Sequence, residues 1–244
     1  MEGIELMKDL YLLPFGGILY KDYVIIADLH LGFEEEMLSK GVYLPPAQLK
    51  RALEVLELAT KLSKKIVVAG DLKHMFSKLG KREQRDVKAF LDRAEMLDVE
   101  LVLVRGNHDN FVRHLLEERG FDVVTQLDLG EVKVVHGHER VEWDGIILMG
   151  HEHPSLGVRD EIGVSVKFPC FLRVPLDKGE AIVLPAIGPY QTGNNVSLHK
   201  EAYLSPIIRD RGRIEEAVPY VIDEELSVIE FPSLGLLEGM LLVQ

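Results

Sequence analysis

The chain has 244 residues, an apolar fraction of 47% and a net charge of −12 at pH 7, which indicate one globular domain over residues 1–244 with a substantial core. This acidity argues against a broad basic surface for duplex DNA, because non-specific affinity for nucleic acid comes mainly from neutralised phosphates. A small substrate or a short nucleic-acid end still fits this charge.

The single cysteine, Cys170, excludes an internal disulfide and a cysteine-based zinc site, and it fits a reducing compartment. The N-terminal stretch mixes charged with apolar residues, unlike a signal peptide, and no uncharged run reaches membrane-spanning length. We therefore expect a cytoplasmic protein without membrane contact. The chain has four asparagines and five glutamines against 28% charged residues, so we also expect a thermophilic source.

Strand-like and helical patterns alternate in the first half of the chain. In chain order, we expect a strand at 24–27, an amphipathic helix at 47–62, a strand at 66–69, a helix at 82–97, a strand at 101–104 and a short helix at 111–119. This alternation favours largely parallel strands that are covered by helices.

Shorter strands dominate the second half. We expect them at 132–135, 146–149, 164–168 and 181–184, where they would form a second sheet. Two sheets face to face with helices outside give an α/β fold, a four-layer αββα sandwich with two mixed sheets. The apolar stretch at 234–243 is too short to span a bilayer. It is interpreted as a terminal strand or packing segment, with a partner-binding tail as the alternative.

Five polar motifs decide the chemistry, and each one follows an apolar run. They are Asp28-Leu29-His30, Gly70-Asp71, Gly106-Asn107-His108-Asp109, His136-Gly137-His138 and Gly150-His151-Glu152-His153. Loops that leave the carboxyl ends of strands in open α/β sheets converge on one crevice. Aspartate, histidine and asparagine side chains hold borderline divalent metals. The motifs therefore predict a single metal site.

This set of motifs, in its order and spacing, resembles the calcineurin-like metallophosphoesterases from about Asp28 to His153. The variants Gly70-Asp71-Leu72-Lys73-His74 and Gly150-His151-Glu152-His153-Pro154 are similar to small archaeal and bacterial phosphoesterases related to the Mre11/SbcD nucleases, including those associated with DNA ligases. Weaker support comes from Leu184-Pro185-Ala186 and Gly193-Asn194-Asn195. The resemblance implies the same four-layer fold.

The resemblance also implies two divalent ions, with Mn²⁺ expected first and Fe, Ni or Zn as alternatives. The implied ligands of the first ion are Asp28, His30, Asp71 and His153. Those of the second are Asp71, Asn107, His136 and His151, with His138 as the alternative to His136. Asp71 would bridge, because one carboxylate can give an oxygen to each of two metals.

In the implied reaction, a hydroxide that bridges the metals attacks phosphorus while His108 protonates the leaving oxygen. Asp109 would orient the His108 ring, with a turn or helix-cap role as its alternative. Arg105 is a candidate phosphate clamp, or else a strand-end surface residue. His74 is expected to contact the substrate or a metal ligand rather than a metal.

The leading functional hypothesis is a phosphodiesterase acting on a small diester, on nucleotides or on nucleic-acid ends. The alternative is a phosphomonoesterase, a nucleotide or protein phosphatase, that uses the same site. A non-catalytic phosphate-binding subunit is disfavoured, because His108 and every implied ligand are present. A homo-oligomer or a DNA-repair partner is also considered.

Overall fold

The apolar runs build two β-sheets in a computed structural model that describes residues 3–159, 165–223 and 227–237. The first sheet has the strand order β1-β2-β3-β4-β5-β6-β7. Its strands are β1 (Ile4–Met7), β2 (Leu10–Leu12), β3 (Ile18–Tyr20), β4 (Tyr23–Ile26), β5 (Lys65–Val68), β6 (Glu100–Val104) and β7 (Asp122–Val124). Neighbours from β1 to β4 are antiparallel and those from β4 to β7 are parallel, so the sheet is mixed.

The second sheet is also mixed and follows the order β14-β11-β12-β13-β10-β9-β8, with β15 paired to β12 and β16 paired to β15. Its strands are β8 (Leu127–Asp128), β9 (Val132–Val135), β10 (Ile146–Met149), β11 (Pro154–Arg159), β12 (Ser165–Pro175), β13 (Glu180–Val183), β14 (Asn194–Asn195), β15 (Val218–Asp223) and β16 (Ser227–Glu230). The predicted strand at 164–168 begins outside the described residues. It was predicted too short, since β12 continues through Pro169, where its neighbour changes from β11 to β15.

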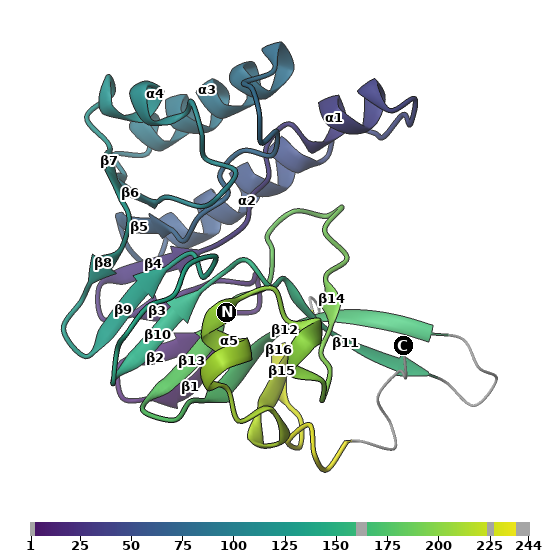
Figure 1. Cartoon of the computed structure of the whole chain (residues 1–244). Helices are drawn as coiled ribbons and strands as arrows, with labels where there is room; N and C mark the ends of the chain where they lie inside the picture. The colour runs from purple at the N-terminus through teal and green to yellow at the C-terminus, as the bar shows by residue number, and fades with distance from the viewer. Residues whose placement is uncertain (1–2, 160–164, 224–226, 238–244) are drawn as a thin grey trace.

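Helices flank the paired sheets on both sides (Figure 1). They are α1 (Phe33–Ser39), α2 (Gln48–Thr60), α3 (Lys81–Met96), α4 (Arg113–Glu117) and α5 (Pro206–Arg211), with 3-10 turns η1 (Lys200–Ala202) and η2 (Ile214–Glu216). The helices α2, α3 and α4 match the predicted segments within a few residues, whereas α1 and α5 were not predicted. None of the helices in the described ranges combines the length and the apolar character needed to cross a bilayer.

Three apolar cores separate the layers. Leu56 and Phe90 pack helices α2 and α3 against the outer face of the first sheet, together with Val24 and Ile26 of β4. The intervening Ile25 points to the opposite face, where the two sheets meet, because successive side chains of a strand alternate. On the outer face of the second sheet, Ile207 and Ile208 of α5 join the apolar side chains of β10, β12 and β13. The predicted four-layer arrangement is thus confirmed, with a thin fourth layer.

The predicted C-terminal segment is described only as far as residue 237. Within it, Leu234 and Leu237 are buried in the outer core of the second sheet, which agrees with a packing role. Residues 238–243 of that segment lie outside the described residues.

Candidate metal centre

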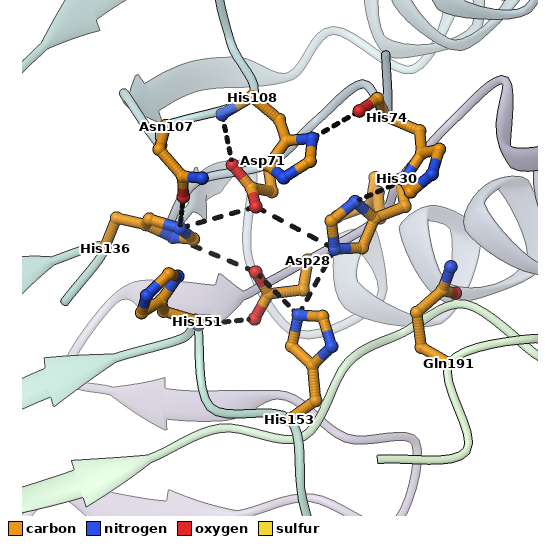
Figure 2. A network of polar contacts seen from close by, with 12 residues as sticks. Asp28, His30, Asp71, His74, Asn107, His108, His136, His151, His153 and Gln191 are labelled. Atoms are coloured by element: carbon orange, nitrogen blue, oxygen red, sulfur yellow. Dashed lines mark hydrogen bonds and ion pairs between the residues drawn. The ribbon is translucent and has the colours of Figure 1, made fainter. Parts of the chain in front are cut away.

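The five motifs leave the ends of β4, β5, β6, β9 and β10 and meet at one edge of the two sheets (Figure 2). Two groups of side chains could each hold a metal ion, because their ligand atoms lie within 4.8 Å of one another. The groups are Asp28, His30 and His153, and Asp71, His136 and His151. Asn107 joins the second group through its Oδ1, 3.1 Å from His136 Nε2. All seven predicted ligands therefore lie together.

Asp71 stands between the two groups. Its Oδ2 lies 3.8 Å from His30 Nε2 and 3.4 Å from His136 Nε2, while its Oδ1 accepts the backbone N–H of His108 at 3.0 Å. The carboxylate is 2% exposed and held by the fold. One oxygen of Asp71 thus faces both groups, as a bridging ligand must.

Asp28 provides a test of whether a cation fits. The residue is fully buried, and its Oδ1 has no hydrogen-bond partner. That oxygen lies 3.3 Å from His153 Nε2 and 3.8 Å from His136 Nδ1. A buried carboxylate oxygen without a partner is costly. A divalent ion bound by this oxygen and by Nε2 of His153 would remove this cost, so the donor set fits a metal.

Of the four proposed ligand histidines, two have lowered pKa values, and the neighbouring carboxylates raise the pKa of the other two, His136 and His153, against burial. Burial lowers the pKa of His30 to about 3 and that of His151 to about 4, so both rings are neutral at pH 7, the form that binds metals. Burial opposes the charge on His136, but the carboxylates of Asp71 and Asp28 raise its pKa to about 9. His136 Nδ1 donates to the Ala69 carbonyl at 3.1 Å, which turns Nε2 toward the centre. A cation arriving there must displace the Nε2 proton.

The motif glycines make room for ligands from other motifs. A Cβ at Gly70 would lie 2.8 Å from the His136 Cβ, and a Cβ at Gly150 would collide with Asp28 Oδ2. A Cβ at Gly106 would collide with Asp71 Oδ1 and lie 2.6 Å from Asp71 N. Each glycine therefore permits a close approach between two strand-end loops.

Left-handed backbone conformations are concentrated at the centre. Positive φ angles occur at several predicted ligands, namely Asp28 (57°), His30 (45°), Asp71 (51°), His151 (72°) and His153 (46°). Such conformations are uncommon for residues with a side chain and cost about 1–2 kcal/mol each. These backbone conformations turn the ligand side chains back toward one point.

The predicted contact between Asp109 and the His108 ring is not formed. Asp109 does not hydrogen-bond to the His108 ring; its Oδ2 accepts the backbone N–H groups of Gly106 and Asp71, both at 2.8 Å. Its Oδ1 accepts Lys73 N at 3.4 Å. The partner of His108 Nδ1 is instead the carbonyl oxygen of His74. Asp109 is buried and locks the loops after β5 and β6 together, which corresponds to the turn role named as its alternative.

His74 contacts a predicted metal ligand. Its Nδ1 lies 3.2 Å from His30 Nδ1, and its Nε2 lies 2.9 Å from Glu36 Oε2. The ring also stacks on His108, with centroids 5.5 Å apart. His30, His74 and His108 form a third group whose ligand atoms lie within 4.8 Å. Glu36 contacts His74, and His74 contacts His30. We interpret these two side-chain contacts as a brace that fixes the orientation of the His30 ring.

His138 lies beside the second group. The His138 ring packs on His136, with centroids 5.2 Å apart, but it belongs to neither of the two ligand groups. Burial lowers the pKa of His138, and the charges of His136 and Arg105 contribute, so Arg105 lies within electrostatic reach of this edge. The Arg105 side chain is exposed.

Buried carboxylates that the sequence analysis missed secure the loops. Glu83 accepts the backbone N–H groups of His74 (2.9 Å) and Met75 (2.6 Å), and Glu152 accepts those of Leu204 (3.1 Å) and Ser205 (2.5 Å). The signal for Glu83 is its position three residues after Gly80, at the start of α3, where it accepts Gly80 N. Glu152 carried no signal, because its partners lie about fifty residues away.

Fold and site together define a metal-dependent phosphoester hydrolase with buried carboxylate and imidazole ligands at the carboxyl edges of two packed sheets. The family described as calcineurin-like phosphoesterase matches residues 22–198. The crystal structure of the Pseudomonas putida nuclease MPE is similar to this chain with a TM-score of 0.67 at 19% identity, covering 94% of this chain and 99% of the other. Among curated proteins, none matches significantly.

The match over residues 22–198 includes every predicted ligand. The chain belongs to the calcineurin-like phosphoesterase family and is a metal-dependent phosphoesterase.

Proposed function

We propose that the chain is a binuclear phosphodiesterase that hydrolyses phosphodiester bonds in nucleotides or at nucleic-acid ends. The observation that carries the proposal is the placement of Asp71 Oδ2, which faces His30 of one group and His136 of the other. A carboxylate oxygen shared in this way supports two ions rather than one.

The first ion would be held by Asp28, His30, Asp71 and His153, and the second by Asp71, Asn107, His136 and His151. Oxygen and nitrogen donors without a thiolate favour Mn²⁺, with Fe²⁺, Ni²⁺ or Zn²⁺ as alternatives. When bound, such ions neutralise phosphate oxygens and lower the pKa of a nucleophilic water.

The chain's own residues complete the chemistry. The His74 carbonyl accepts a hydrogen bond from His108 Nδ1, which leaves Nε2 of His108 to carry the proton that the leaving oxygen receives. Arg105, whose side chain is exposed, would bind a non-bridging phosphate oxygen through its guanidinium group. Asp109 acts as a positioning residue, since it fixes the backbone of Gly106 and Asp71 on either side of the centre.

A diester is favoured over a monoester on electrostatic grounds. A diester carries one negative charge on phosphorus, whereas a monoester carries nearly two at neutral pH. The net charge of −12 penalises the second charge outside the metal centre. Inside the centre the ions reverse the sign, so we expect a modest preference that shrinks as salt screens the surface. The nuclease that shares this fold is consistent with a diester substrate.

The test compares kcat/KM for bis(p-nitrophenyl) phosphate and p-nitrophenyl phosphate, which share a leaving group, with Mn²⁺ at low and high salt. We expect the diester to be preferred at low salt and the ratio to fall at high salt. The variant Asp71→Asn, purified in parallel, controls for contaminating phosphatases. A clear monoester preference at both salt concentrations would reject the diesterase in favour of the phosphatase.

A further inference from the structure

A large apolar ring is exposed beside His108. Phe76, in the loop between β5 and α3, is 57% exposed, and its ring centroid lies 5.8 Å from that of His108 in a T-shaped arrangement. An exposed phenylalanine contributes little to the core. Phe76 lies against His108, which is proposed to protonate the leaving oxygen. This position indicates that Phe76 contacts the substrate.

The loop presents this ring in a defined position. The Asn110 side-chain amide donates to the carbonyls of Phe76 and Asn107, both at 3.3 Å, which joins the loop to a predicted metal ligand. On the other side, Glu83 accepts Met75 N, and the buried Lys73 Nζ donates to Met75 O. The backbone of Phe76 is therefore braced although its side chain is open to solvent.

A second exposed phenylalanine lies next in sequence to Asn110, whose side chain contacts the Phe76 loop. Phe111 directly follows Asn110, is 65% exposed and has a φ of 69°. A positive φ is a genuine outlier for a bulky residue, and such strained positions cluster at functional sites. Two exposed aromatic residues thus border the loop contact between Asn110 and Phe76.

Resting on the proposed diesterase function, we propose that Phe76 is a base-stacking residue that binds the nucleobase of the departing nucleoside in a single-stranded substrate. The metal centre takes the scissile phosphate, and His108 faces the leaving oxygen. The group attached to that oxygen must then extend past His108, where it meets Phe76. Every nucleobase has a face that can stack on such a ring, so this contact tolerates sequence.

Because the chain is acidic, base stacking would be an important source of its affinity for nucleic acid. Proteins that grip nucleic acid through phosphates need many cationic groups, and a net charge of −12 works against that mode. Stacking supplies affinity without charge. A base held in a duplex is already stacked and paired, so the same surface selects an unpaired base at a strand end or in a single strand.

The experiment uses a thymidine dinucleotide with one linking diester, two analogues that each lack one base, and a fourth that lacks both. Product analysis identifies which nucleoside departs. For the wild-type protein with Mn²⁺, we expect kcat/KM to fall about 5- to 100-fold when the departing nucleoside loses its base. We expect Phe76→Ala to abolish this difference, Phe76→Trp to retain it, and bound metal to be unchanged in both.

Phe168→Ala is the matched control, since it removes another exposed phenylalanine from β12 and should keep the wild-type base preference. An undiminished preference in Phe76→Ala, or none in the wild type, would overturn the stacking role. Absence of metal-dependent cleavage of all four substrates would instead overturn the proposed function. The stacking role is then decided by fluorescence quenching of a 2-aminopurine dinucleotide, which we expect in the wild type and not in Phe76→Ala.

Discussion

Gly106→Ala tests whether the motif glycines serve the metal centre rather than the fold. The added Cβ would lie 2.6 Å from Asp71 N, whereas ordinary contacts begin at 3.4 Å, so about 0.8 Å of movement is required (3.4 − 2.6). The same Cβ collides with Asp71 Oδ1, which accepts the His108 N–H. Overpacking of this kind costs about 1–3 kcal/mol of stability. A catalytic displacement near 1 Å can cost about 10²-fold in rate.

We therefore expect Gly106→Ala to remain folded, to bind metal more weakly and to lose about 10²-fold in kcat/KM. Metal content after dialysis, metal titration by calorimetry and turnover measure these effects. Gly120→Ala is the control, because Gly120 has a φ of +77° and no atom lies within 4 Å of the place that an added Cβ would take. It should lower the melting temperature slightly and leave metal binding intact. Two tightly bound metal equivalents and normal turnover in Gly106→Ala would refute the close-approach argument.

Four further outcomes are expected. Asp71→Asn should remove metal from both groups and abolish turnover; two retained equivalents with normal activity would contradict the bridging assignment. His108→Ala should lower turnover by roughly 10²–10⁴ with metal content intact, and less for leaving groups of low pKa; equal losses across a leaving-group series would argue against a general acid. Glu36→Gln should weaken metal binding about 10- to 100-fold through His74, whereas Lys40→Gln, which removes the other partner of Glu36, should not; equal affinities in the two variants would reject the brace. Chelation should lower the melting temperature by roughly 5–11 °C per site. A bound ion present at about 100 times its Kd stabilises the folded state by about 2.7 kcal/mol, and each kcal/mol shifts the melting temperature by about 2–4 °C. An unchanged melting temperature would contradict a resident ion.

The parallel core of the fold and the gathering of the seven proposed ligands could be predicted because strand periodicity and strand-end motifs are local signals. The N-terminal strands β1 to β3 could not. The turns after β1 and after β3 place Asp9 (φ 63°) and Lys21 (φ 53°) in conformations that usually call for asparagine or glycine, so the usual signal is missing at these two turns, although Gly16 (φ 92°) provides it between β2 and β3. The short helix α1 begins after Gly32 without a side-chain cap, which removed the signal for its start.

Side-chain pairings were harder to predict than side-chain positions. Asp109 neighbours His108 in sequence, which suggested a catalytic pair. Its carboxylate instead accepts hydrogen bonds from backbone N–H groups on two loops. The brace on His30 comes from Glu36 on α1, a helix that the sequence did not predict. Both cases depend on which loops meet in three dimensions, and a one-dimensional pattern does not carry that information.

Backbone strain and buried charge at the centre point to a single cause. Five of the seven proposed ligands hold positive φ angles, which together cost on the order of 5 kcal/mol, and the typical stability of a domain is only about 5–15 kcal/mol. Oδ1 of the buried Asp28, which has no hydrogen-bond partner, adds a desolvation cost at the same place. A chain that only needed to fold would relax these loops. Their retention is explained if metal ligation offsets the strain, since ion binding to the folded state contributes free energy that the unfolded chain does not gain.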